Sequence, residues 1–156
     1  MTSGLPPESE WPSWMVIAAR DVGVRELPGV ATHPRIAEYY RHTNLGGEPE
    51  DGAVAWCSAA MCCWIDEAGY IATSRANARS WLGWGEPLKQ PRLGCVVVFS
   101  RGNPSSKQGH VALYVGPGSK AHITVLGGNQ GNSVRFAEYE SARVLGYRWP
   151  KQSDRL

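Results

Sequence analysis

The sequence has no long hydrophobic run and little charge of either sign. Of its 156 residues, 16 are Lys or Arg and 14 are Asp or Glu, which gives a formal net charge of +2 at pH 7. The basic residues form no cluster, so the stripe of positive charge that is typical of nucleic-acid-binding domains is missing. No apolar run approaches the roughly 20 residues of a membrane-spanning helix. We therefore expect neither a nucleic-acid partner nor stable insertion into a membrane.

The four cysteines lack the spacing of a disulfide framework or of a metal site. They are Cys57, Cys62, Cys63 and Cys95. They include no C-x-x-C pair, and the adjacent Cys62 and Cys63 are awkward partners for each other within a helix. Histidine and cysteine spacings give no convincing zinc-binding set. We expect four reduced thiols, no metal and no cofactor.

The amino terminus lacks a basic segment followed by an apolar run, which is the pattern of a secretory signal peptide. We therefore expect a protein that is made soluble in a cytoplasm and leaves it only with the help of another factor. The length suits one domain with a single core, and no internal repeat is present. We expect residues 1–12 to form a flexible arm, residues 13–150 to form a single domain, and residues 151–156 to form a tail.

Helical patterns precede strand patterns along the chain. We expect a helix capped by Ser13 that ends near Gly23, a second helix from Pro34, a third that Gly69 ends, and a short one around residues 76–82. From residue 95 on, β-branched or aromatic runs alternate with turn residues; these runs are CVVVFS, HVALYVG, HITVLGG, SVRFAEY and RVLGYRW. This order predicts an α+β domain whose early helices pack on one face of a five-stranded antiparallel sheet.

The third helix carries the first candidate for chemistry. If it begins near Trp56, one apolar stripe contains Cys57, Met61, Trp64, Ile65 and Ala68. The stripe turns Cys57 toward the body of the protein, whereas Cys63 and Asp66 fall on the opposite, solvent-facing side. Unpaired backbone N–H groups and the helix dipole in the first turn favour a thiolate, which is a nucleophile. The alternative is that Cys57 is only a small buried hydrophobic residue.

A cysteine nucleophile needs a base, and four histidines are available. His110 is the best placed, because it opens a strand directly after the polar loop RGNPSSKQG and can be held rigidly there. His33 and His42 flank a helix and are expected to be solvated. His122 follows a turn and is interpreted as an ordinary residue at a strand end. A purely structural role for His110 stays open.

A third group must fix the tautomer of the imidazole ring by accepting its other N–H. Antiparallel pairing of residues 111–115 with residues 122–126 would leave residues 127–130 near His110. Asn129 is the candidate in this segment and Gln130 is a close alternative. A simple turn role for Asn129 is the other interpretation.

Four segments, AWCS, GHVALYVG, VLGGNQ and VLGYRWP, resemble papain-like cell-wall amidohydrolases of the CHAP and NlpC type. The similarity runs from Trp14 to Pro150 and is greatest to a phage-associated branch. It implies a papain-like fold with Cys57 as nucleophile, His110 as base and Asn129 as the orienting residue. Two departures concern the third group: Gly127 stands in place of the glutamate of the Glu-x-Asn pattern, and the third histidine of the NlpC type is missing unless His122 serves.

The resemblance implies a cysteine hydrolase that cuts an amide bond of peptidoglycan, most plausibly a phage endolysin that another factor releases to the wall. The backbone N–H of Cys57 would stabilise the oxyanion. Trp56, Trp81, Trp84 and Gln130 are candidates for lining the substrate cleft, although each tryptophan could equally belong to the core. We expect a monomer. The alternatives are a secreted antibacterial effector of the same chemistry and a non-catalytic module that binds the cell wall.

Overall fold

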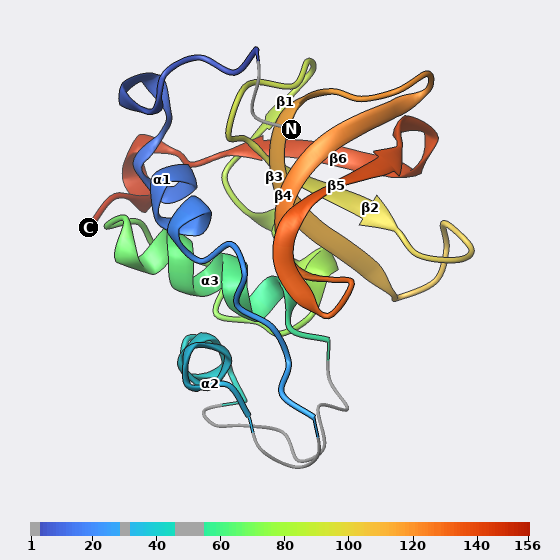
Figure 1. The fold of residues 1–156 in the computed structure, drawn as a ribbon. Coiled ribbons are helices and arrows are strands. Elements are labelled where there is room, and N and C mark those ends of the chain that lie inside the picture. Colours follow the sequence, from blue (N-terminus) through green and yellow to red (C-terminus); the bar gives the residue numbers. More distant parts are fainter. Residues whose placement is uncertain (1–3, 29–31, 46–54) are drawn as a thin grey trace.

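The computed structural model describes residues 4–28, 32–45 and 55–156, and its helices precede its strands (Figure 1). The α-helices are α1 (Ser13–Arg20), α2 (Pro34–Arg41) and α3 (Cys57–Glu67). The strands are β1 (Glu86–Leu88), β2 (Val96–Ser100), β3 (Gly109–Pro117), β4 (His122–Gln130), β5 (Ser133–Glu140) and β6 (Val144–Trp149). Short 3₁₀ helices are η1 (Glu8–Glu10), η3 (Ala78–Gly83), η4 (Ser141–Arg143) and η5 (Gln152–Asp154). No helix in these ranges is long and apolar enough to cross a membrane.

The strands form one antiparallel sheet in the order β1-β6-β2-β3-β4-β5. The α+β architecture is therefore confirmed, with six strands where the sequence predicted five. The additional strand is β1, in a segment whose Gly-Glu-Pro sequence is typical of irregular structure. Pro87 is accommodated there because β1 lies at the edge of the sheet and pairs with β6 alone.

The main core lies between the helices and one face of the sheet. Alternate residues of β2 and β3, such as Val98 and Val111, face the helices and join one cluster with residues of α1, α2 and α3. The residues between them, such as Phe99 and Ala112, form a second cluster on the other face of the sheet. Figure 1 shows α3 running between α1 and α2 beside this sheet. The helix that carries Cys57 is thus the central one.

Helix α3 is buried on nearly all sides, and this corrects one expectation. Cys63, which we predicted to face solvent, has an exposed fraction of 0%. Burial raises the pKa of its thiol, and the charges of Arg35 and Glu67 act on it from nearby. The amphipathic pattern therefore identified the side of α3 that faces the sheet but not the side that α2 covers.

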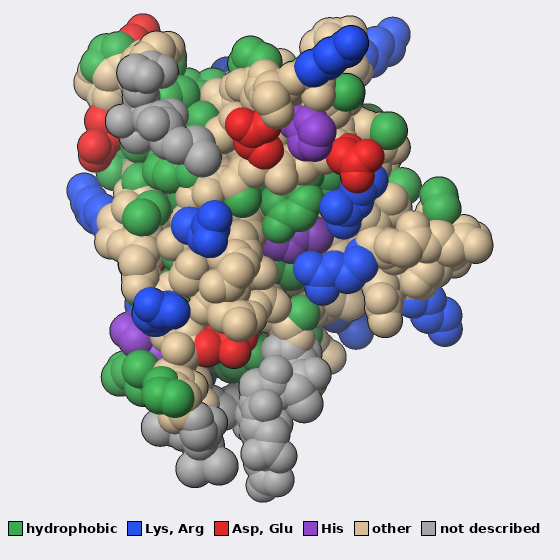
Figure 2. Space-filling view, turned by 45° about the vertical axis from the view of Figure 1, so that its right-hand side comes forward, with side chains coloured by type: hydrophobic (Ala, Val, Ile, Leu, Met, Phe, Trp, Pro, Cys, Tyr) green, Lys and Arg blue, Asp and Glu red, His purple; other side chains and the backbone are tan. Residues whose placement is uncertain are grey.

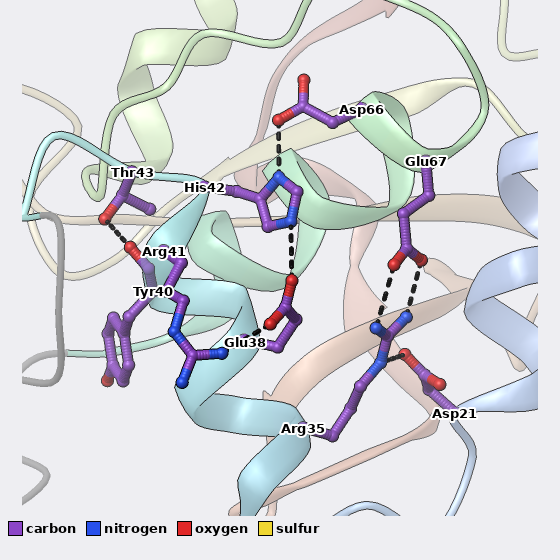
Figure 3. A network of polar contacts seen from close by, with 9 residues as sticks. All are labelled: Asp21, Arg35, Glu38, Tyr40, Arg41, His42, Thr43, Asp66 and Glu67. Carbon is purple, nitrogen blue, oxygen red and sulfur yellow. Dashed lines mark hydrogen bonds and ion pairs between the residues drawn. The ribbon is translucent and has the colours of Figure 1, made fainter.

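Figure 3 shows the polar contacts that tie the three helices together. Arg35 of α2 donates from Nε to Asp21 Oδ2 at 2.9 Å and from Nη2 to Glu67 Oε1 at 2.7 Å. His42 lies between Asp66, at 2.7 Å from Nδ1, and Glu38, at 3.4 Å from Nε2. His42 is therefore part of this network and not a solvated residue as predicted.

Both ends of the described chain contact the domain. Leu5 and Trp11 pack against the main core. At the other end, the Leu156 N–H donates to Gly69 O at 2.8 Å, and the Ile71 N–H donates to Asp154 O at 2.7 Å. The flexibility of residues 1–12 and the division into arm, domain and tail stay predictions.

Candidate active site

Cys57 is the first residue of α3 and has an exposed fraction of 3%. Burial raises the pKa of its thiol, which is opposite to the lowering that we predicted from the helix start. The backbone N–H of Val111 hydrogen-bonds to the thiol and acts in the other direction, with a smaller effect. Val111 directly follows His110, so the thiol contacts the backbone of the strand that carries the histidine. The thiol is therefore protonated at neutral pH in the folded protein.

His110 lies near the start of β3 with an exposed fraction of 0%. Its Nε2 is 2.8 Å from Gln130 Oε1, and Gln130 Nε2 donates to the carbonyl oxygen of Arg135 at 2.6 Å. The second bond orients the amide, so its oxygen faces the ring and accepts a proton that His110 carries on Nε2. His110 Nδ1 is then an acceptor. It is buried and has no hydrogen-bond partner among the described residues.

The surroundings of His110 keep the ring uncharged. Burial has the largest effect and lowers its pKa from 6.5 to about 4. The hydrogen bond that the ring donates to Gln130 raises the pKa, and the charges of Arg101 and Arg143 lower it. Tyr139 of β5 stacks on the ring, with 4.9 Å between centroids, and Phe99 of β2 stacks at 6.1 Å. At pH 7 the site therefore contains a neutral imidazole and a neutral thiol.

A cleft of about 350 Å³ gives access to Cys57. It is lined by Ala55, Cys57, Ala76, Asn77, Ala78, Arg101, Lys107, Gln108 and Gly109. The lining comes from the start of α3, the segment leading into η3, and the loop between β2 and β3. The candidate nucleophile and a basic loop therefore line the same cleft.

The residue that contacts the imidazole of His110 is Gln130 and not Asn129. Strands β3 and β4 are antiparallel neighbours as expected, but Leu126 lies opposite Leu113 and not opposite Val111, so the register differs by two residues from the predicted one. The pairing still brings the end of β4 to His110. A shift of register between Gly127 and Gln130 then interrupts the pairing of β4 with β5. Asn129 lies in this irregular stretch with φ of 56°. Our alternative residue, Gln130, makes the contact that we expected of Asn129.

Gly127 makes room for this arrangement. A Cβ atom at this position would lie 2.8 Å from Gln130 Oε1 and 2.9 Å from Ala112 Cβ, both closer than such atoms approach. A larger side chain at residue 127 would therefore displace the glutamine. The glycine that departs from the Glu-x-Asn pattern is the residue that lets Gln130 reach the imidazole.

The tryptophans predicted to wall the cleft belong to the core instead. Trp56, Trp81 and Trp84 have exposed fractions of 1%, 0% and 7%, and none of them lines the cleft. Each indole N–H donates inside the protein: to Glu26 Oε1, to Ser58 Oγ and to Ile71 O, respectively. Their hydrogen bonds are satisfied without a ligand. The three tryptophans are therefore core residues, which was the alternative to a role in lining the cleft.

Three further side chains, those of His122, Tyr139 and Arg101, differ in whether they belong to the site. His122 lies apart from it, with Nδ1 2.8 Å from Lys120 O. Tyr139 and Arg101 belong to it, although neither was predicted. Tyr139 lies on β5, which is separated from the His110 strand by β4, and its ring stacks on His110 only in the folded sheet. All four cysteines carry free thiols. Within the described ranges, no three His, Cys, Asp or Glu residues are arranged to hold a metal ion.

Residues 47–129 match the CHAP domain, and this match covers more than half of the chain. The chain belongs to the CHAP domain family. This family and the NlpC/P60 family generally consist of cysteine peptidases and amidases that act on peptidoglycan. The matched range contains Cys57 and His110 and ends at Asn129, one residue before the glutamine that contacts the imidazole.

The fold of this CHAP domain is also similar to a solved structure from Staphylococcus aureus subsp. aureus Mu50, described as similar to a lipoprotein of the NLP/P60 family. The TM-score is 0.52 at 12% sequence identity, over 97% of this chain and 46% of that one. The chain thus spans about half the length of that protein, and the likeness concerns the fold. No curated protein matches the sequence.

Proposed function

We propose that this CHAP domain is a cysteine hydrolase that cleaves an amide bond in the stem peptide of peptidoglycan. One observation carries the proposal: His110 is neutral, its ring is oriented by Gln130, and its Nδ1 is buried without a partner among the described residues, while the next residue of the same strand, Val111, donates its backbone N–H to the Cys57 thiol. A buried acceptor without a partner costs stability. A base that must take the proton of a thiol needs such an acceptor.

The reaction starts with transfer of the thiol proton of Cys57 to His110 Nδ1 as the sulfur attacks the carbonyl carbon of the amide. The backbone N–H of Cys57 has no acceptor within the helix, because it lies in the first turn, and it stabilises the oxyanion. His110 then returns the proton to the leaving amine, and the C–N bond breaks to give a thioester. Water, deprotonated by His110, hydrolyses the thioester, which releases a carboxylate and restores the thiol.

The same site argues against a module that only binds the cell wall. Such a module needs neither a buried base nor an amide whose orientation is fixed by a second hydrogen bond. The tryptophans that suggested carbohydrate binding are buried, so they offer no exposed aromatic platform. The catalytic interpretation accounts for both features.

Within this activity we propose the role of a phage endolysin, a monomer that acts on bacterial peptidoglycan after another factor has released it from the cytoplasm. The support for this role is the sequence resemblance to the phage-associated branch. An antibacterial effector that uses the same residues would have the same site. Clearing of intact bacteria only when a membrane-permeabilising protein is present would favour the endolysin role.

The decisive experiment is digestion of purified peptidoglycan by the wild type and by Cys57→Ser, followed by mass spectrometry of the soluble fragments. We expect the wild type to release fragments with new amino and carboxyl ends, which identify the amide bond that is cut. Cys57→Ser should lose at least about 1000-fold in rate, since the hydroxyl is a much weaker nucleophile than a thiol. Cys57→Ser with undiminished activity would overturn the proposal.

The matched control is Cys62→Ser, five residues along the same helix. Cys62 Sγ lies 3.7 Å from both Thr73 Oγ1 and Arg75 O, so a hydroxyl finds hydrogen-bond partners there. This variant should keep the fold and the activity. Equal losses in the two variants would show that substitution in α3 disturbs the protein generally and that Cys57 has no special role.

A further inference from the structure

Two cationic side chains on the loop between β2 and β3 line the same cleft as Cys57. Arg101 and Lys107 have no hydrogen bond or ion pair with any of the residues that the structure describes, and none of the described residues that line the cleft is a carboxylate. Among the described residues, the charges of Arg101 and Lys107 are therefore not compensated by a carboxylate.

The loop is attached to the body of the domain by Arg79 of η3. Its Nε donates to Gln108 O at 2.7 Å and its Nη1 donates to Pro104 O at 2.8 Å. Gly109 completes the attachment, since a Cβ there would lie 3.1 Å from Arg79 Cγ and 2.9 Å from Phe99 O. These contacts fix the loop backbone beside the segment 76–78 on the other side of the cleft.

The charge of Arg101 reaches both reacting groups. It lowers the pKa of the Cys57 thiol and the pKa of His110, although in each case burial has the largest effect. Figure 2 shows Lys and Arg side chains on both the left and the right of this face of the molecule, several of them in its right-hand half. The cleft is therefore positive at the nucleophile itself and not only at a distant rim.

We propose that the cleft selects anionic substrates, with Arg101 and Lys107 binding a free carboxylate of the peptide close to the scissile amide. This inference deepens the proposed function and depends on it for the identity of the reaction. Guanidinium and ammonium groups that are not already paired bind carboxylates well, because little of their charge is compensated beforehand. A peptide with its carboxylates amidated would lose this interaction.

The first test needs no peptidoglycan. It measures alkylation of Cys57 by anionic iodoacetate and by neutral iodoacetamide, with peptide mapping, and compares the ratio of the two rates with the ratio for 2-mercaptoethanol. We expect the rate with iodoacetate divided by the rate with iodoacetamide to be larger at Cys57 than for 2-mercaptoethanol. This ratio should fall with added salt, which screens the cationic side chains. Because both reagents attack the same thiol, a change in the pKa of Cys57 cancels in the ratio.

The double variant Arg101→Gln with Lys107→Gln should lower this ratio by about 2- to 10-fold, as expected for two partly exposed charges. The control is Lys89→Gln, which removes an exposed cation after β1, away from the cleft, and should leave the ratio unchanged. An unchanged ratio in the double variant would overturn the proposal. Failure of both reagents to modify Cys57 at a pH high enough to ionise this thiol would overturn it as well, because the cleft would then not admit a small ligand.

The second test compares native peptidoglycan with peptidoglycan whose carboxylates have been amidated. The wild type should have a KM at least several-fold lower on the native polymer, and the double variant should not distinguish the two. If neither polymer is cut while the alkylation ratio behaves as expected, the proposed reaction fails and the anionic selectivity stands. If both are cut equally well by the wild type, the reaction stands and the selectivity fails.

Discussion

The proton positions of Cys57 and His110 follow from burial more than from the helix start. At the first turn of α3, unpaired N–H groups favour a thiolate, but removal from water has the larger effect and raises the pKa of the thiol. The same removal lowers the pKa of His110 to about 4. In the folded protein both groups are therefore neutral, and in the proposed reaction the thiolate forms only as the substrate carbonyl is attacked.

Gln130 controls which nitrogen of His110 accepts that proton. Gln130→Ala removes the oxygen that accepts from Nε2–H, so the ring can turn or change tautomer, and we expect the rate of peptidoglycan cleavage to fall about 10- to 1000-fold. The loss should appear in kcat, since Gln130 does not line the cleft. Steady-state kinetics on solubilised peptidoglycan measure this.

The control for Gln130 is its neighbour. Asn129→Gly suits the backbone φ of 56° and removes only the side chain that was predicted to orient the ring. This variant should keep most of the activity. A greater loss in Asn129→Gly than in Gln130→Ala would return the orienting role to Asn129.

At the scale of elements, the position of α3 depends on one carboxylate outside it. Asp21, just after α1, accepts at Oδ2 from Arg35 Nε at 2.9 Å, from Tyr39 OH at 2.6 Å and from Trp64 Nε1 at 2.9 Å. These donors belong to α2 and α3. A single carboxylate oxygen therefore connects all three helices. Because it fixes the position of α3, it also fixes the position of Cys57.

Asp21→Ala should lower the free energy of unfolding by about 2 to 4 kcal/mol, because two buried donors and a guanidinium lose their acceptor together. Urea unfolding at pH 7 measures the change. Arg41→Ala is the contrast: its pair with Glu38 is exposed, and such pairs contribute about 1 kcal/mol or less. Equal effects of the two substitutions would contradict a central role for Asp21.

Periodicity in the sequence predicted those elements that a local pattern determines. The second helix begins at Pro34 as expected, and the five predicted strands form with β3 and β4 paired to bring residues 127–130 to His110. The predictions that were not met concern contacts between segments that are distant in the sequence. Cys63 is buried because α2 covers it, and the three cleft tryptophans are buried because their indole N–H groups have internal acceptors. Gln130 replaces Asn129 because an irregularity in β4 changes which side chain points at the ring.

For the molecule as a whole, burial of His110 links stability to pH. Its pKa is about 4 when folded and near the ordinary 6.5 when unfolded, so the unfolded chain binds more protons between these values. Stability is therefore fully present above pH 6.5 and falls as the pH decreases toward 4. The carboxylates whose pKa is lowered, such as Glu67, begin to contribute only below their ordinary value of 4.5. A change in the free energy of unfolding between pH 7.5 and pH 5 therefore arises mainly from histidines.

We expect the free energy of unfolding to be about 2 kcal/mol smaller at pH 5 than at pH 7.5, from the difference of about 2.5 pKa units at His110. Urea unfolding at both pH values measures this difference. His110→Gln cannot take up the proton, so its stability should change much less over the same range, whatever its absolute stability. His122→Gln, which removes an imidazole outside the core, should keep the wild-type difference. If wild type and His110→Gln lose stability equally between pH 7.5 and 5, His110 is not the buried neutral base on which the proposed mechanism depends.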